Sequence, residues 1–174
     1  MDLRYPIGRF EGPNSIGAGE RREYLRQIAA APGWFRDAVR GLGESQLDTP
    51  YRPGGWTVRQ VVHHMADSHL NNYVRVRLAL TEDEPVIKPY DQTAWAELAD
   101  ARTAPVEVSL ALIESLHARW VALAEGLSED GFARAFLHPE QGRVRLDFNL
   151  AMYAWHCRHH AAHITGLRER EGWK

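Results

Sequence analysis

Apolar residues recur at three- and four-residue steps in four long stretches of the chain, which is the spacing of one face of a helix. The pattern predicts helices over residues 20–41, 57–80, 106–126 and 147–170. Thr57 is a suitable N-cap and Gln60 follows three residues later, so the second helix is expected to begin with a capping box. Pro32 and Gly33 interrupt the first pattern, and we expect that helix to bend or break there.

The segments between these helices are rich in proline, glycine and polar residues, which is typical of loops. Residues 48–55 and 82–90 are predicted loops, residues 93–99 a short helix, and residues 128–146 a mixed segment with a turn at 142–144. Residues 1–18 are predicted to form an irregular arm. Four long helices favour an all-α fold, a four-helix bundle. The connection over residues 81–104 is too long for a simple hairpin, so at least one crossover is expected.

The composition limits the class of protein. A chain of 174 residues fits one domain, spanning 1–174, with a core large enough to fold without a disulfide. The single cysteine, Cys157, fits a reducing compartment. No signal peptide and no run of roughly 18 apolar residues is seen, so we expect a cytoplasmic protein with no membrane contact. The net charge of −2 and the absence of a basic tract argue against nucleic-acid binding.

Four of the nine histidines lie close together in the last predicted helix. Side chains four positions apart project from the same helix face, so His156 with His160, or His159 with His163, can share one metal ion. The midpoint of the first pair lies roughly 60° from the apolar stripe of this helix, and that of the second roughly 120°. The first pair is therefore the predicted pair of ligands. His159 and His163 are expected to face more toward solvent, either behind the ligands or at the surface.

A third ligand would come from another helix, and periodicity does not select it. The second long helix carries His63, His64 and His69, of which His69 lies nearest the apolar stripe. Histidines also occur on polar helix surfaces with no metal role, so a plain bundle with incidental histidines is an alternative. That alternative predicts that the imidazoles do not converge.

The run from Gly55 to His69, together with Trp155, His156 and His160, resembles the DinB/YfiT superfamily. The similarity extends over nearly the whole chain and is greatest to the YfiT branch of metal-dependent hydrolases, which includes bacillithiol S-transferases. The resemblance implies a four-helix bundle of DinB/YfiT type with long crossover connections and one divalent metal ion held by three histidines. Carried over position by position, the ligands fall on His64, His156 and His160. Members of this branch also form homodimers, so a homodimer is expected.

Three neutral imidazoles would leave a divalent cation with its full charge and at least one open position. Such a site lowers the pKa of bound water toward about 7, or stabilises a thiolate. Zinc is the first expectation and nickel also suits imidazole, whereas magnesium and calcium prefer oxygen. We therefore predict a divalent-metal-dependent enzyme with a small-molecule substrate, either a hydrolase or a low-molecular-weight-thiol (bacillithiol-type) S-transferase. The alternative function is a non-enzymatic metal-binding stress-response protein.

Three nearby side chains have expected roles. Asp67 and Gln60 lie three and four positions from His64, so either could help to orient its ring, but the expected roles are a solvated helix residue for Asp67 and a capping partner for Gln60. Cys157 falls in the apolar stripe of the last helix, and we expect a small buried residue rather than a nucleophile.

Overall fold

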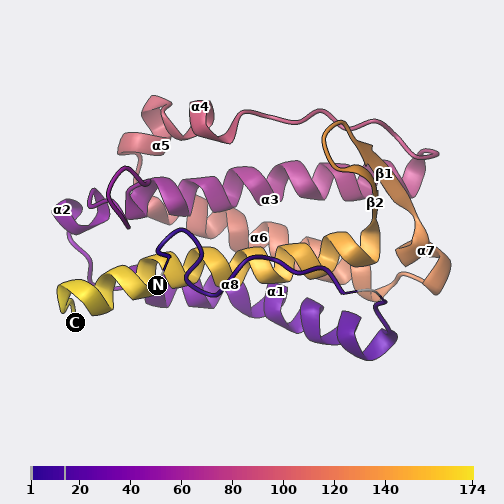
Figure 1. Cartoon of the computed structure of the whole chain (residues 1–174), viewed down its shortest axis with the longest axis horizontal. Coiled ribbons are helices and arrows are strands. Elements are labelled where there is room, and N and C mark those ends of the chain that lie inside the picture. The colour runs from indigo at the N-terminus through magenta and orange to yellow at the C-terminus, as the bar shows by residue number, and fades with distance from the viewer. Residues whose placement is uncertain (1, 14) are drawn as a thin grey trace.

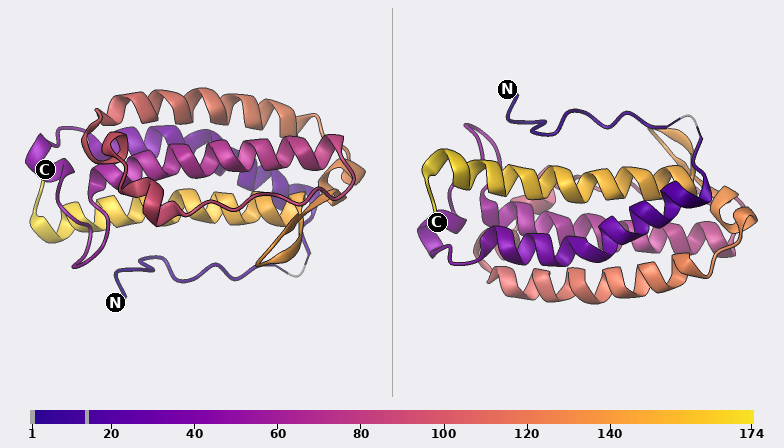
Figure 2. Two further views of the ribbon diagram at one scale, coloured as in Figure 1. Left: turned by 90° about the horizontal axis from the view of Figure 1, so that it is seen from above. Right: turned by 90° about the horizontal axis from the view of Figure 1, so that it is seen from below.

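Four long helices lie side by side in the computed structural model of the chain, which describes residues 2–13 and 15–174 (Figure 1). An irregular N-terminal segment runs along one side of the bundle, and a two-stranded sheet lies at one end (Figure 2). The described part of the predicted arm contains no helix or strand before Ala18; residues 1 and 14 lie outside the description. None of the described helices is both long enough and apolar enough to cross a membrane.

The bundle is formed by α1 (Ala18–Val39), α3 (Val58–Thr81), α6 (Val106–Glu125) and α8 (Leu146–Glu171). The connections contain the short helices α2 (Glu44–Leu47), α4 (Gln92–Ala96), α5 (Ala99–Thr103) and α7 (Glu129–Ala133). Strands β1 (Ala135–His138) and β2 (Gly142–Arg145) pair as an antiparallel hairpin between α7 and α8. The predicted four-helix bundle is confirmed, with its long helices where the apolar pattern places them.

The long connection between α3 and α6 makes these two helices parallel neighbours. It leaves the end of α3, runs back along the bundle, and forms α4 and α5 before α6 begins beside the start of α3 (Figures 1 and 2). Helices α1 and α8 are also parallel neighbours and run in the opposite direction. Helix α1 also packs against α6, and α3 packs against α8. The diagonal pairs are therefore α1 with α3 and α6 with α8, and the connections within both pairs cross the bundle. The expected crossover is present in the connection where the sequence predicts it.

The start of α3 is fixed by two reciprocal side-chain hydrogen bonds. The backbone N–H of Gln60 donates to Oγ1 of Thr57 (3.1 Å), and the backbone N–H of Thr57 donates to Oε1 of Gln60 (2.9 Å). This capping box satisfies two amides that a helix end would otherwise leave unpaired. It sets the first turn of α3 and therefore the direction in which His64, two turns later, projects.

Pro32 lies inside α1, and the helix is not broken there. Proline has no N–H, so the carbonyl four residues earlier loses its helical partner. That carbonyl belongs to Ile28, and its oxygen lies 2.7 Å from Nδ1 of His117 on α6. A side chain of a neighbouring helix thus replaces the missing backbone donor.

The segment before α8 differs from the prediction. Residues 142–144, a predicted turn, belong to β2, in which Val144 lies opposite Phe136 of β1. The turn falls at residues 139–141, and Gly142 follows it with a φ of 72°, a conformation open to glycine. Strands of four residues are too short to show the two-residue alternation that identifies a strand. Likewise, the single helix predicted over 93–99 is two short helices, α4 and α5.

Two apolar clusters fill the bundle, and a layer of histidines lies between them. Phe35 and Ile113 belong to one cluster, and Trp120 and Leu150 belong to the other. On α3, His69 lies between the residues of the two clusters, and on α6 His117 follows Leu116, the first residue of the second cluster; their rings are 0% and 1% exposed. Burying a polar ring costs free energy unless its nitrogens find partners, and apolar residues would fill this space more simply. The layer therefore points to a role beyond folding.

Candidate metal centre

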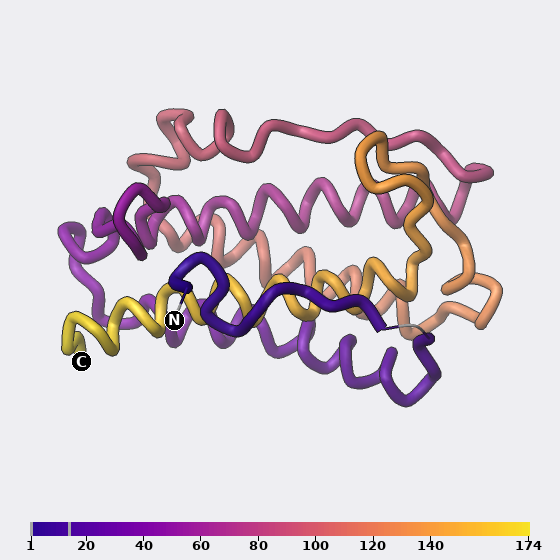
Figure 3. Tube along the Cα trace, in the orientation of Figure 1, coloured from indigo at the N-terminus to yellow at the C-terminus, as the bar shows by residue number. Residues whose placement is uncertain are grey.

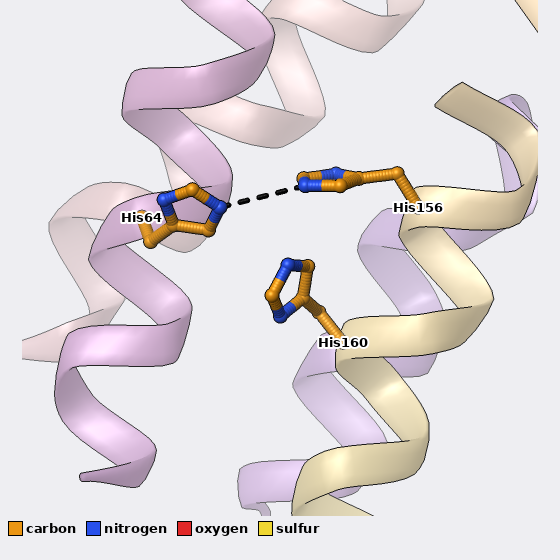
Figure 4. Close-up of side chains that lie close together, drawn as sticks. All are labelled: His64, His156 and His160. Carbon is orange, nitrogen blue, oxygen red and sulfur yellow. Dashed lines mark hydrogen bonds between the residues drawn. The ribbon is translucent and has the colours of Figure 1, made fainter. Parts of the chain in front are cut away.

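Three histidines from two helices converge between α3 and α8. His64 projects from α3, while His156 and His160 project from consecutive turns of α8 (Figure 4). The Nε2 atoms of His64 and His156 are 3.4 Å apart, and one ring nitrogen from each of the three residues lies within 4.8 Å of the others. The arrangement contradicts the alternative of incidental, scattered histidines. That these three residues bind a metal stays a prediction.

The neighbouring His63 points elsewhere. Its Nδ1 lies 2.7 Å from the hydroxyl oxygen of Ser109, and its Nε2 lies 3.1 Å from the carbonyl oxygen of Ala104. Ser109 belongs to α6 and Ala104 is the C-cap of α5, so neither partner lies on α8. Of the two adjacent histidines, only His64 is placed to join the pair on α8.

Burial keeps the three converging imidazoles neutral. His64 and His160 are buried and His156 is half-buried. Loss of water around His64, helped by repulsion from neighbouring histidines, lowers its pKa to about 4. Burial also lowers the pKa of His156 and His160 well below the ordinary value. A neutral imidazole keeps one bare nitrogen, which is the form that binds metals.

The donor set suits a divalent transition metal. All three donors are nitrogens, and no fourth histidine, cysteine or carboxylate joins the group within residues 2–13 and 15–174. Imidazole nitrogen suits zinc and nickel, whereas magnesium and calcium call for oxygen ligands that this group lacks. Three protein ligands leave a coordination position for water or substrate.

The three histidines line a cavity of about 440 Å³. Its walls include Trp56 and Trp155, and the side chains of Arg4 and Arg52 also border it. A second cavity of about 510 Å³ lies alongside, and His156 lines both. A small molecule in either cavity would therefore lie close to a candidate ligand, and the arginines favour one with negative charge.

His159 and His163 are buried, so the prediction that they face more toward solvent is wrong. The ring of Tyr5 lies 5.9 Å from that of His159, and the ring of Tyr51 stacks on that of His163 with centroids 3.9 Å apart. Both tyrosines come from outside the bundle helices: Tyr5 from the arm that runs alongside α8 (Figure 3) and Tyr51 from the loop before α3. The apolar pattern of α8 alone cannot predict that side chains from distant segments bury these two rings.

Neither of the two polar side chains close to His64 in the sequence orients its ring. Gln60 caps α3 and donates to the carbonyl oxygen of Ala96 (2.7 Å), and no hydrogen bond joins Asp67 to His64 among the described residues. Other histidines lie behind the two candidate ligands of α8. Nε2 of His69 lies 3.2 Å from Nδ1 of His156. The position of His69 on the apolar stripe of its helix was the one sequence signal of this role.

His163 lies behind His160, the other candidate ligand on α8. Nδ1 of His163 is 3.3 Å from Nδ1 of His160. Of the two places expected for His163, behind the ligands or at the surface, the first is the one found.

Cys157 lies in the apolar core and is fully buried. Burial raises the pKa of its thiol above the ordinary value, so the sulfur stays protonated at neutral pH. A protonated, enclosed thiol is a poor nucleophile, and this agrees with the expectation that Cys157 is a packing residue.

The fold and the site together define a helical bundle built around a candidate three-histidine metal centre. The chain belongs to the DinB superfamily, because the sequence model of that family matches residues 27–164, which contain all three converging histidines. The resemblance recognised in the sequence is confirmed.

Individual relatives match along the whole chain. A Bacillus subtilis (strain 168) protein named "Putative metal-dependent hydrolase YfiT" is 48% identical over 174 residues, covering 99% of this chain and 98% of its own. A Bacillus cereus (strain ATCC 10987 / NRS 248) protein named "Putative metal-dependent hydrolase" is 51% identical over 172 residues, covering 99% of this chain and 99% of its own. The solved structure of YfiT, described as having an unusual four-helix bundle topology, superposes with a TM-score of 0.98 at 47% identity over 100% of both chains.

Proposed function

We propose that this protein is a divalent-metal-dependent enzyme that acts on a small molecule, either as a hydrolase or as a low-molecular-weight-thiol S-transferase. The observation that carries the proposal is the convergence of His64, His156 and His160 at a cavity with no fourth protein ligand among the described residues. An open position distinguishes catalytic from closed structural metal sites. The names of the relatives, which refer to metal-dependent hydrolases, support the same proposal.

Some residues of the site would bind the metal, and others would position the substrate. Three neutral imidazoles hold one zinc or nickel ion without offsetting its charge, and the metal supplies the Lewis acidity that activates a water or a thiol. Trp56 and Trp155 restrict the water around the reacting groups. Arg4 and Arg52 attract a substrate or thiol that carries negative charge.

Metal content tests the site directly. Protein purified without a histidine tag is expected to contain about one zinc or nickel ion per chain. His160→Ala should lose this metal, whereas His63→Asn should keep it, because His63 is a buried histidine of the same helix region that faces away from the site. Wild-type protein with no metal, or a His160→Ala variant with undiminished metal, would reject the proposal.

The two reaction classes are separated by the nucleophile that they require. Thiol transfer predicts that metal-loaded protein accelerates conjugation of an electrophile such as monochlorobimane to bacillithiol, mycothiol or glutathione, and that chelation abolishes the acceleration. Hydrolysis predicts turnover of ester or amide substrates with no thiol present. If neither reaction is accelerated by protein with a full complement of metal, the non-enzymatic metal-binding role replaces catalysis.

We also propose that the protein is a homodimer. Four large apolar side chains are exposed on the adjacent helices α3 and α6: Leu70, Val74, Val108 and Leu112, at 41%, 49%, 58% and 42%. Apolar side chains gathered on neighbouring elements are typical of protein interfaces. Light scattering should give twice the 19.8 kDa chain mass, and a Val108→Glu, Leu112→Glu variant should be monomeric. A wild-type monomer at micromolar concentration would exclude the dimer.

A further inference from the structure

A line of hydrogen bonds leaves the candidate metal centre at His156 and ends on the backbone of α1. Nδ1 of His156 lies 3.2 Å from Nε2 of His69, and Nδ1 of His69 lies 2.8 Å from Nε2 of His117. Nδ1 of His117 lies 2.7 Å from the carbonyl oxygen of Ile28. The line therefore passes from α8 through α3 and α6 to α1, within the buried histidine layer that separates the two apolar clusters.

The carbonyl at the end of the line sets the direction of every bond in it. A carbonyl oxygen only accepts, so His117 carries its proton on Nδ1 and its Nε2 is bare. That bare nitrogen accepts from Nδ1–H of His69, whose own Nε2 is then bare and accepts from Nδ1–H of His156. His156 is left with a bare Nε2, and this is the atom that faces His64 (Figure 4).

Pro32 makes the terminal acceptor available. In an uninterrupted helix the carbonyl of Ile28 would accept the backbone N–H of residue 32, but proline has none. The oxygen of Ile28 is left without its helical donor and pairs with His117 instead. A proline inside a helix is costly, and here the vacated carbonyl is the fixed end of a line that reaches the metal centre.

A shorter line reaches the second ligand of α8. Nδ1 of His160 lies 3.3 Å from Nδ1 of His163, and Nε2 of His163 lies 3.2 Å from the carbonyl oxygen of Arg4. By the same reasoning His163 carries its proton on Nε2 and accepts on Nδ1, so His160 carries its proton on Nδ1. Its Nε2 is bare, and one ring nitrogen of His160 is turned toward the other two rings (Figure 4).

Neutral rings are required for this reasoning, because a doubly protonated histidine donates from both nitrogens. His117 and His163 are only 1% and 3% exposed, and their hydrogen-bond partners are carbonyl groups and other imidazoles, with no carboxylate to offset a charge, so both rings are neutral. His64 has no comparable line of hydrogen bonds within residues 2–13 and 15–174. The two lines therefore belong to the two ligands that share a helix.

We propose that His69, His117 and His163 are positioning residues that hold His156 and His160 in the single tautomer, protonated on Nδ1, that leaves Nε2 free for the metal. This inference rests on the proposed metal site. The other tautomer would put a proton on the ligating nitrogen and exclude the ion until the proton moved. Partners behind the ligands of other metal sites act in the same way, and their loss typically weakens metal binding 10–100-fold.

Nitrogen NMR of the full-length wild-type protein, freed of metal with a chelator, tests the tautomers with no substitution. Protonated and bare ring nitrogens have distinct chemical shifts. The expected result is Nδ1–H and bare Nε2 at His156, His160, His69 and His117, and the reverse at His163. A proton on Nε2 of His156 or His160 would overturn the proposal, whether or not the protein has any enzymatic activity.

A matched pair of substitutions at His117 tests the consequence for binding. In His117→Gln the amide oxygen can stand where Nε2 stood and still accept from His69, whereas His117→Leu keeps the bulk and removes the acceptor. Zn²⁺ affinity, measured by chelator competition, should fall roughly 10–100-fold in His117→Leu and stay within about threefold of wild type in His117→Gln. Equal affinities in the two variants would overturn the proposal.

The same contrast applies at His163. The amide oxygen of His163→Asn can accept from His160 in place of Nδ1, and His163→Leu cannot. Folding of all four variants is checked by circular dichroism, so lost structure is not mistaken for lost positioning. If wild-type protein itself fails to bind Zn²⁺, the proposed metal site is wrong, and the tautomers measured by NMR still decide the hydrogen-bond directions.

Discussion

Nε2 of His163 lies 3.2 Å from the carbonyl oxygen of Arg4, although the two residues are 159 positions apart in the sequence. The contact ties the N-terminal arm to α8 directly behind a candidate metal ligand. Further along the arm, Phe10 packs edge-on against Phe148, with ring centroids 5.4 Å apart. The arm is thus part of the wall of the site rather than a loose extension.

Removal of residues 2–8 is predicted to weaken Zn²⁺ binding by about tenfold, because His163 loses its fixed acceptor and His160 loses its support. The bundle should stay folded, since none of these residues belongs to either apolar cluster. Arg4→Ala is the matched control: it keeps the backbone carbonyl and should leave metal affinity unchanged. Chelator competition measures both, and full affinity after the deletion would contradict the role of the arm.

Acidification is predicted to destabilise the metal-free protein below about pH 6.5. Burial lowers the pKa of His64 and of His117 from 6.5 to about 4 in the folded state. Between these values the unfolded chain binds more protons, so the stabilising contribution is complete above 6.5 and is lost as the pH falls toward 4. Each such histidine should cost about 1.4 kcal/mol per pH unit in this window.

Urea unfolding of chelated protein at a series of pH values measures this dependence. His117→Gln has no ring to titrate and should show a shallower slope. A free energy of unfolding that stays constant from about pH 7 to about pH 5 would show that these rings are not held neutral by burial.

Arg59→Met is predicted to lower the free energy of unfolding by about 2 kcal/mol. The guanidinium is buried, at 2% exposure, and donates to Oδ1 of Asp48 (2.7 Å), to the carbonyl of Ala104 (2.9 Å) and to Glu44. These bonds join the first turn of α3 to α2 and to the end of α5. The stranded carboxylates are partly exposed and can be rehydrated, so the loss falls below that of a fully buried pair.

The control for this substitution is Arg102→Met, which removes an exposed ion pair with Glu97 and should change stability by at most about 0.5 kcal/mol. Denaturant unfolding compares the two variants. Equal effects would mean that burial adds nothing to the interactions of Arg59.

Cys157 is predicted to resist iodoacetamide in the native protein and to react fully in urea. Its thiol is enclosed and burial raises its pKa, so both access and thiolate are lacking. Cys157→Ala should retain metal and any activity, at a modest cost in stability from the small cavity. Rapid alkylation of native protein, or loss of activity with metal still bound, would assign the thiol a chemical role.

The start of α3 and the shared face of the candidate ligands His156 and His160 on α8 follow from local sequence rules. Thr57 and Gln60 form the capping box that their spacing predicts, because it depends on four consecutive residues only. His156 and His160 converge with His64, as the helical phase of α8 indicates, and their binding of a metal stays a prediction. His64 could not be selected this way. Residues 58–66 of α3 are all buried, so the apolar pattern there does not indicate which side of the helix faces the site. Family resemblance supplied it.

Other features depend on contacts between distant segments. Tyr5 helps to cover His159, together with Trp155 of α8, and Tyr51 covers His163; no pattern within α8 predicts the position of either tyrosine. From the sequence alone, Pro32 predicts a bend or break in the helix. Its effect on α1 is decided by His117, a residue 89 positions away from Ile28.

The separation of the candidate ligands along the chain has a consequence for the order of assembly. His64 and His156 are 92 positions apart, so the nascent chain has no binding site until α8 has docked against α3. Contacts of such long range close large loops and form late in folding. An ion that binds only the finished bundle draws the folding equilibrium toward it, so metal supply in the cell would set how much of the protein survives quality control.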